Sequence, residues 1–470
     1  MESPVHPPRA TGAANRAGTV TLLVVLLGCL TLVMRSNRLD SLVRAGALIA
    51  ATGAFLSLLF ITQFRRALTM GMVLVASSLL LVVAVASPPR ESNDLWSYAI
   101  YGRVLEHYHA NPYTHPPDEF WTDLTFQRVG TTWRHTESVY GPLFTAVSAG
   151  ITRTTNDQPL STRLAFQGLA ALAVFLSLLI LEAHTRDPAT VALVGLNPVV
   201  IYAVVNSGHN DALVGLGLLA GVLLAKRQRW AWAGFVIALA VLVKIVAGLA
   251  LAALVVWAWR QRGRRPAVVI AAVSGATIAI SYLAAGGPAA LRPLGDARSH
   301  LSRSSVWQLV RPGGLAHLAG LADLPSSGPL TTQVIAAGSS ILVVALAGVF
   351  VSSRLRDPTP TLVMASALVA YLLAAAYLLP WYSMWVLPIL ALQWRSGLAR
   401  VVLAQSLLMM IAYQYRHGFP SALPYKTLWF SDPALLAFEL VAIVALVVAA
   451  YRRWKVEPRA LPDAPAEMPV

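Results

Sequence analysis

The sequence predicts an all-α protein that crosses a lipid bilayer many times. Of its 470 residues, 57% are apolar and only 12% are charged, which excludes a soluble globular protein. Apolar runs long enough to cross a bilayer recur from residue 19 to residue 451. These runs are unbroken and rich in Ala, Leu and Val, whereas the strands of a membrane β-barrel alternate over about ten residues. Helices are therefore the expected spanning elements.

The first three apolar runs, at 19–34, 43–62 and 67–86, lead into a long polar segment, 87–138. That segment has four basic residues and seven acidic ones. Because basic residues collect in cytoplasmic loops, we expect it to be an outer loop. Counting back through three crossings places the N-terminus in the cytoplasm.

The apolar stretch 230–259 has basic residues at both ends, so both ends are expected to be cytoplasmic. A stretch that enters and returns leaves about 15 residues per arm, or ~22 Å of helix, which is shorter than the ~30 Å hydrocarbon core. We expect a short or broken hairpin whose tip lies in the outer half of the membrane. Lys244 lies almost at its midpoint.

The 13-residue apolar segment 139–151 is expected to be re-entrant or interfacial. If it crossed, the basic clusters beside the hairpin would move outside, against the positive-inside rule. The later spans are expected at 163–182, 189–206, 210–225, 266–285, 331–352, 361–379, 383–394, 397–414 and 433–451, about 14 crossings in all. We thus expect one transmembrane domain with outer loops at 87–138 and 286–330, a disordered cytoplasmic tail before residue 19 (1–18) and a cytoplasmic tail at 452–470.

Lys and Arg total 36 against 21 Asp and Glu, which gives a net charge of +15. In a soluble protein this excess would suggest nucleic acid binding, but here the positive-inside rule explains it, and no nucleic acid partner is expected. Cys29 is the only cysteine, so neither an intrachain disulfide nor a cysteine metal site is expected.

Pro88 and Pro89 end the third span, and the next residues predict an interfacial helix from Asn93 to His109. Its apolar and aromatic residues form one stripe, while its polar residues face elsewhere. Asp94 lies in the first turn of this helix. There it either acts as a base at the membrane surface or only balances the helix dipole, which is worth ~0.3–1 kcal/mol.

Several other polar residues stand where apolar ones would cost less. Lys244 interrupts an apolar hairpin. A lysine at the centre of a membrane helix raises the free energy of insertion by about 2.5–3.5 kcal/mol, so Lys244 either pairs with an anion or extends to the membrane interface. The turn His209-Asn210-Asp211 is either functional or a polar helix cap, and the aromatic run at 380–385 either lines a site or belongs to an aromatic belt.

Basic residues in the second expected outer loop run against the topology rule and suggest an anionic ligand. Taken together, these residues suit a lipid-linked sugar phosphate. Apolar and aromatic walls would hold the chain and the sugar, cations would hold the phosphate, and a carboxylate would deprotonate an acceptor hydroxyl.

Five sequence blocks resemble, in content and order, the actinobacterial polyprenol-phosphomannose-dependent mannosyltransferases of the GT-C glycosyltransferase superfamily. The resemblance implies a GT-C-like multi-helix fold with extracytoplasmic interfacial helices, in the plasma membrane, with the active site on the outer face. The blocks are SPPRESNDLWSYAIYGRVLEHYHANPY from residue 87, WRHTESVYGPLF from 133, LNPVVIYAVVNSGHNDAL from 196, LVKIVAGLALAAL from 242 and PWYSMWVLPILAL from 380.

The resemblance further implies an inverting, metal-independent transfer of mannose from polyprenyl-phosphate mannose to a cell-envelope glycan or glycolipid, within membrane lipid and without a cofactor. Asp94 matches the expected catalytic base. Many GT-C enzymes have two adjacent acids there, whereas this chain has Asn93-Asp94, which implies a single base. The residues expected to bind the donor and its phosphate are Lys244, Arg303, Arg298, His209, Asp211 and Asn210. Those expected to bind the acceptor or sugar are Tyr98, Arg103, Tyr140, Trp381 and Tyr382.

Two other functions stay open on the sequence alone. One is a GT-C transferase that uses another polyprenyl-phosphate sugar, such as arabinofuranose. The other is a transporter or flippase, for which a buried Lys244 and broken helices are also expected, although no pseudo-symmetric halves are evident. A metal site is not expected on the interfacial helix, because His107 and His109 would point about 200° apart.

Overall fold

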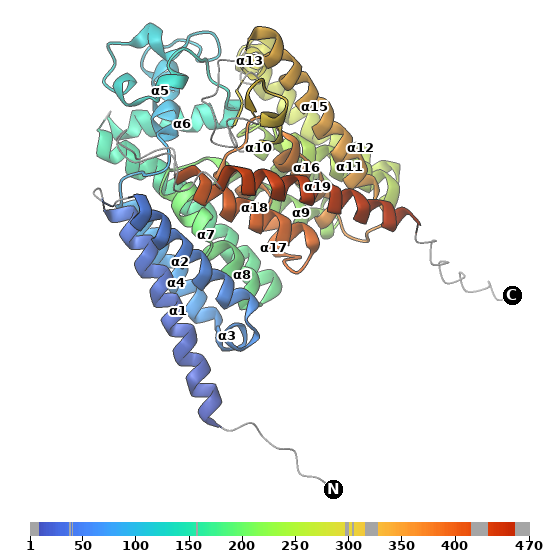
Figure 1. Cartoon of the computed structure of the whole chain (residues 1–470). Coiled ribbons are helices and arrows are strands. Elements are labelled where there is room, and N and C mark those ends of the chain that lie inside the picture. The colour runs from blue at the N-terminus through green and yellow to red at the C-terminus, as the bar shows by residue number, and fades with distance from the viewer. Residues whose placement is uncertain are drawn as a thin grey trace, which may run out of the picture.

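The computed structural model of the chain describes residues 9–36, 39, 41–156, 158–296, 300–302, 305–314, 328–414 and 431–455. Within these ranges the regular structure is entirely helical (Figure 1). Seven of the described helices are long and apolar enough to cross a membrane, and four shorter apolar helices accompany them. The predicted class, an all-α polytopic membrane protein, is confirmed.

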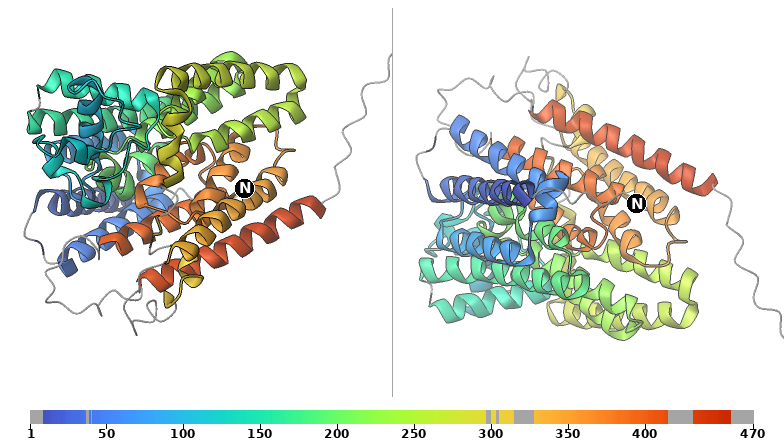
Figure 2. Two further views of the ribbon diagram at one scale, coloured as in Figure 1. Left: turned by 90° about the horizontal axis from the view of Figure 1, so that it is seen from above. Right: turned by 90° about the horizontal axis from the view of Figure 1, so that it is seen from below.

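The N-terminal helices form one side of the molecule, drawn in blue in Figures 1 and 2. The helix α1 packs against α2 and α4, and the short helix α3 folds back onto α1 and α2. Of these helices, α1, α2 and α4 correspond to the first three expected spans, and α1 begins at Arg9, within the stretch 1–18 that was expected to be a tail. Their bounds are α1 Arg9–Arg35, α2 Ser41–Phe60, α3 Thr62–Ala67 and α4 Met70–Ala86.

The expected interfacial helix forms as α5, Asp94–Glu106, and packs closely on α6, Pro142–Thr155. The two helices lie at the end of the molecule away from the start of α1 (Figure 1). Gly102 allows their close approach, because a Cβ there would lie 2.6 Å from the backbone of Ser148. Three short 3-10 helices lie between α5 and α6: η1 Pro117–Phe120, η2 Phe126–Arg128 and η3 Thr131–Trp133.

The surroundings of α5 differ from the expected surface helix with one polar face. Every residue from Leu95 to Val104 is buried, including the polar Ser97 and Arg103. The cause is twofold, because α6 packs along the helix and the following loop folds back over it. One of its anchors is the hydroxyl of Tyr101, which donates to the carbonyl of Thr136 at 2.6 Å. A helical pattern cannot foresee this cover.

The broken hairpin predicted around Lys244 is confirmed. Its arms are α10, Trp230–Val241, and α11, Ala247–Arg262, of 12 and 16 residues, and Lys244 lies in the turn between them. The arm α10 packs against α9 and α12, and α11 packs against α12 and α16. The other helices of this middle part are α7 Pro159–Thr185, α8 Pro188–Gly195, the π-helix η4 Val199–Val205, α9 Asp211–Lys226 and α12 Arg264–Ala284.

The C-terminal third departs from the expected spans at residues 383–394. This stretch belongs to η8, Pro380–Trp385, and α17, Leu387–Ala391, each too short to cross a membrane alone. Pro388 accounts for the break, because it has no amide hydrogen to donate to the carbonyl of Met384 in a continuous helix. Both elements are buried against α9, so the aromatic run lies inside the protein and not in an aromatic belt.

The remaining described elements complete the side opposite α1 to α4, with α18 between the two sides (Figure 2). There α15 packs on α16, and α19 packs on α15 and α18. The bounds are η5 Gly287–Leu291, α13 Arg292–Asp296, η7 Val306–Leu309, α15 Pro329–Ser352, α16 Thr361–Ala374, α18 Gly397–Gln414 and α19 Ser431–Lys455.

Candidate active site

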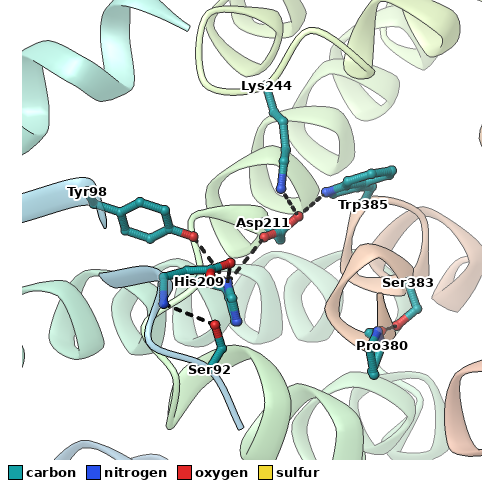
Figure 3. Close-up of polar contacts among 9 residues, drawn as sticks. Ser92, Tyr98, His209, Asp211, Lys244, Pro380, Ser383 and Trp385 are labelled. Carbon is teal, nitrogen blue, oxygen red and sulfur yellow. Dashed lines mark hydrogen bonds and ion pairs between the residues drawn. The ribbon is translucent and has the colours of Figure 1, made fainter. Parts of the chain in front are cut away.

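Four ionisable side chains from distant parts of the sequence converge in one cluster. Asp94 is the first residue of α5, His209 lies in the turn before α9, Asp211 is the first residue of α9, and Lys244 lies in the hairpin turn. Figure 3 shows Lys244 pointing at Asp211, and Tyr98 pointing at His209. Three of the five sequence blocks thus meet at one place.

Asp211 is the centre of the cluster and is fully buried. Its Oδ1 accepts a hydrogen bond from the ammonium of Lys244 at 2.9 Å and another from the indole N–H of Trp385. A buried carboxylate is costly unless it is paired and hydrogen-bonded, and these two partners satisfy both needs.

Aromatic rings surround the Lys244 ammonium. Its Nζ lies 4.6 Å from the ring centre of Tyr382 and 5.3 Å from that of Trp385, and these two rings stack at 4.3 Å. The electron-rich faces of aromatic rings attract a cation. Lys244 therefore does not need to snorkel to an interface, because the protein interior stabilises its charge.

His209 links the two carboxylates. Its Nδ1 lies 3.1 Å from the hydroxyl of Tyr98, 3.7 Å from Oδ2 of Asp94 and 3.9 Å from Oδ2 of Asp211. The ring is fully buried and stacks on Trp381 with the ring centres 3.9 Å apart. Burial, and then the charge of Lys244, lower the pKa of His209 well below its ordinary value, so the imidazole is neutral.

Asp94 is the most accessible carboxylate of the cluster, with 18% of its side chain exposed. Burial raises its pKa to about 6, and the charge of Asp211 acts in the same direction. The hydroxyl of Ser92 and the charge of Lys244 oppose this rise. A carboxylate with a pKa near the working pH is suited to accept a proton from a substrate hydroxyl.

The cluster also holds buried polar atoms that have no hydrogen-bond partner among the described residues. They are Nε2 of His209, Nδ2 and Oδ1 of Asn210, and Oδ2 of Asp211. Buried polar atoms in proteins are nearly always hydrogen-bonded. The set includes both donors and acceptors, and sugar hydroxyls have the matching chemistry.

A hydrogen-bond network ties the His-Asn-Asp turn to the segment that leads into Asp94. The side chain of Asn206 donates to the carbonyl of Pro88 at 3.1 Å and accepts from the backbone N–H of Arg90 at 3.1 Å. The amide of Gln167 donates to the carbonyl of Asn206. The chain then turns at Gly208, whose φ of +70° lies in the region that favours glycine. The network thereby joins the segment before Asp94 to the turn before Asp211.

The structure brings some of the predicted site residues together and not others. Tyr140 lies behind Tyr98, with edge-to-face rings 4.8 Å apart. Arg103 lies nine residues beyond Asp94 on α5, roughly 13 Å along the helix axis, and its Nε pairs with Asp123 at 2.6 Å. It anchors the loop that covers α5. The predicted Arg298 and Arg303 lie outside the described residues.

Two contributors to the site were not predicted from the sequence. Trp385 bonds to Asp211, and the Ser92 hydroxyl accepts from the backbone N–H of Asp94 at 3.0 Å. A signal for Trp385 was present, since it follows Trp381 by four residues in the same aromatic run. Ser92 gave no signal beyond its nearness to Asp94.

The histidines of the loop after α5 pair with acids at the surface. His115 lies 2.7 Å from Glu119 and His135 lies 2.6 Å from Asp118. In the part of the chain that the structure describes, no three His, Cys, Asp or Glu side chains gather in a group that could hold a metal ion.

Comparison with known proteins gives one curated relative. The chain is 28% identical over 171 residues to alpha-(1→6)-mannopyranosyltransferase A of Corynebacterium glutamicum. The aligned stretch covers 35% of this chain and 34% of that protein, so the chain spans about a third of the length of the curated relative. No solved structure matches the chain.

Residues 4–261, just over half of the chain, match the MptA/MptB family, described as alpha-(1→6)-mannopyranosyltransferase, N-terminal domain. The matched range includes Asp94, His209, Asp211 and Lys244, whereas the aromatic run that lines the cluster lies beyond it. The resemblance noted in the sequence is thereby confirmed. The protein belongs to the alpha-(1→6)-mannopyranosyltransferase (MptA/MptB) family.

Proposed function

We propose that the protein is an integral-membrane mannosyltransferase. It takes a mannosyl residue from polyprenyl-phosphate mannose and adds it to a hydroxyl of a cell-envelope glycan or glycolipid, on the outer face of the plasma membrane. The name of the curated relative suggests that the new linkage is α-(1→6). The excess of acids in the segment 87–138 favours an outer position for Asp94, with both termini in the cytoplasm.

In the proposed reaction, Asp94 removes the proton from the acceptor hydroxyl. An electron pair of the deprotonated acceptor oxygen attacks the anomeric carbon of mannose from the face opposite the phosphate, and the configuration at that carbon inverts. The bond between the anomeric carbon and the phosphate oxygen breaks, and polyprenyl phosphate leaves with the electron pair. General-base help of this kind typically contributes ~10²–10⁴ in rate.

Lys244 is suited to receive the departing phosphate, which gains negative charge as the bond breaks. Its ammonium has three N–H donors, and the contact with Asp211 uses one of them. A cation about 4 Å from a phosphate oxygen, at an effective dielectric of about 20, gains ~4 kcal/mol, on the scale of three decades in rate. A fixed cation could thus supply the stabilisation with no cofactor.

His209 lies beside Asp94 and is suited to complete the sugar site. With its proton on Nδ1, the neutral ring donates to the hydroxyl of Tyr98 at 3.1 Å and presents Nε2 as an acceptor. Trp381 stacks on this ring, and Tyr382 lies against Lys244. Asn210 would then supply a donor and an acceptor for the sugar hydroxyls.

The observation that carries the proposal is the placement of a base and a cation in one cluster. Asp94 has a raised pKa, and a chain of three contacts through His209 and Asp211 links it to Lys244. A transferase that separates an acceptor proton from a leaving phosphate needs these two groups on opposite sides of the sugar.

The test uses purified protein in lipid vesicles with radiolabelled polyprenyl-phosphate mannose and an oligomannoside acceptor. We expect the label to move onto the acceptor, with no transfer in an Asp94→Asn protein. A parallel reaction with polyprenyl-phosphate arabinofuranose tests the other sugar donor. Movement of the labelled donor across the bilayer without any transfer would instead establish a flippase and overturn the proposal.

A further inference from the structure

The segment that begins α6 contacts both the Asp94 side of the cluster and the turn that carries Lys244. Tyr140 packs against Tyr98 on the side of Asp94. The next residue, Gly141, donates its backbone N–H to the carbonyl of Val243 at 3.1 Å, in the turn that carries Lys244.

The N-terminus of α6 holds the hairpin turn by its backbone. Besides Gly141, the N–H of Leu143 donates to the carbonyl of Leu242 at 3.1 Å, and the N–H of Phe144 lies 3.4 Å from the same oxygen. The first N–H groups of a helix have no partner within the helix, so they are available for such contacts. The turn carbonyls and the helix start thus satisfy each other.

This contact leaves no room for a side chain at residue 141. A Cβ there would lie 2.1 Å from the carbonyl oxygen of Leu242 and 2.4 Å from its carbonyl carbon, whereas real Cβ contacts under 3.0 Å essentially never occur. The φ of Gly141 is −69° and its ψ is 159°, which any residue adopts. Glycine is therefore required for its small size and not for its conformational freedom.

We propose that Gly141 is a positioning residue for Lys244. Because it has no side chain, the start of α6 can pack directly against the hairpin turn. This packing places the ammonium of Lys244 beside Asp211. The inference rests on the proposed role of Lys244 in donor binding and leaving-group stabilisation. It adds a residue outside the cluster on which that role depends.

The consequence of a methyl group at this position follows from the distances. In Gly141→Ala the carbonyl of Leu242 has to retreat by roughly an ångström, and Lys244 follows two residues later. A misplacement of about 1 Å can cost ~10²-fold in rate. The same helix supplies a matched control, because a Cβ on Gly150 would meet nothing within 4 Å.

The experiment is a double-mutant cycle with Gly141→Ala and Lys244→Met, read as single-turnover mannosyl transfer and, separately, as donor affinity. We expect Gly141→Ala to lower the transfer rate by ~10²-fold, and Gly150→Ala to change it less than twofold. In the Lys244→Met background, Gly141→Ala should cost less than about threefold, because the group that it positions is gone.

Two results would overturn the inference while leaving the proposed function intact. One is a Gly141→Ala protein with a rate within about threefold of wild type. The other is an equal loss of rate in both backgrounds, which indicates a general structural defect.

If Gly141→Ala does not fold, Val243→Gly loosens the turn beside Lys244 without a steric contact. The loss of rate that it causes must again vanish in the Lys244→Met background. Full activity of Lys244→Met itself would instead overturn the proposed role of the cation.

Discussion

The raised pKa of Asp94 predicts how the transfer rate depends on pH. With a pKa of about 6, roughly 90% of the Asp94 side chains are ionised at pH 7 and about 10% at pH 5. Since only the ionised form accepts the acceptor proton, kcat/KM should fall about tenfold over this interval. With the ordinary pKa of 3.8, the loss would be only about 6%. The predicted kcat/KM therefore decreases as the pH falls.

The assay is kcat/KM for the labelled donor, measured from pH 5 to pH 8.5 in lipid nanodiscs, with thermal unfolding recorded at each pH as a control for the fold. The donor is a phosphodiester and does not titrate in this range. Burial lowers the pKa of His209 well below its ordinary value. Lys244→Met should move the inflection upward, since the lysine charge lowers the pKa of Asp94. A rate that stays nearly flat down to pH 5, or an unchanged inflection in Lys244→Met, would refute the reasoning.

Three further changes follow from the described contacts. Lys244→Met should slow single-turnover transfer by ~10²–10³-fold, as the leaving phosphate loses its cation, and should also lower the thermal stability, since the buried Asp211 loses its partner; a rate within tenfold of wild type counts against that role. Asp123→Asn removes a buried partner of Arg103 and should lower the free energy of unfolding by about 3–5 kcal/mol, visible as faster proteolysis of the loop over α5; unchanged cleavage would show that the pair is not the anchor. Gly102→Ala should separate α5 from α6 and lower the melting temperature, whereas Gly168→Ala, with nothing within 4 Å of the new methyl group, should not; equal melting temperatures would contradict the close packing.

Much of the fold could be predicted because membrane insertion leaves strong marks in a sequence. Run lengths located the first three helices, and basic residues on both sides of 230–259 predicted two short arms with Lys244 in the turn. The run at 383–394 misled the prediction, because apolar length alone does not tell a spanning helix from a buried, broken one. Pro388 was the available signal.

The site was predictable to the extent that its residues lie in short blocks. Lys244 stood out because a cation in an apolar hairpin is costly without a reason, whereas Asp94 was identified through the resemblance, in which the base follows a proline pair. The partner of Asp211 could not be foreseen in the same way, since Trp385 lies 174 residues away and only the packing of η8 on α9 brings it there. Arg103 was instead predicted to belong to the site, whereas it pairs with Asp123 in the loop that covers α5. A helical pattern gives no information about such a loop partner.

The central claim is that Asp94 acts as the base of a mannosyl transfer, and the Asp94→Asn protein tests it most directly. Asparagine keeps the size of the side chain and removes its basicity, so the effect on the transfer step can be measured separately from the effect on donor binding. We predict a donor Kd within about threefold of wild type, together with a single-turnover transfer rate at least a hundredfold lower. Near-normal transfer by Asp94→Asn would contradict the account.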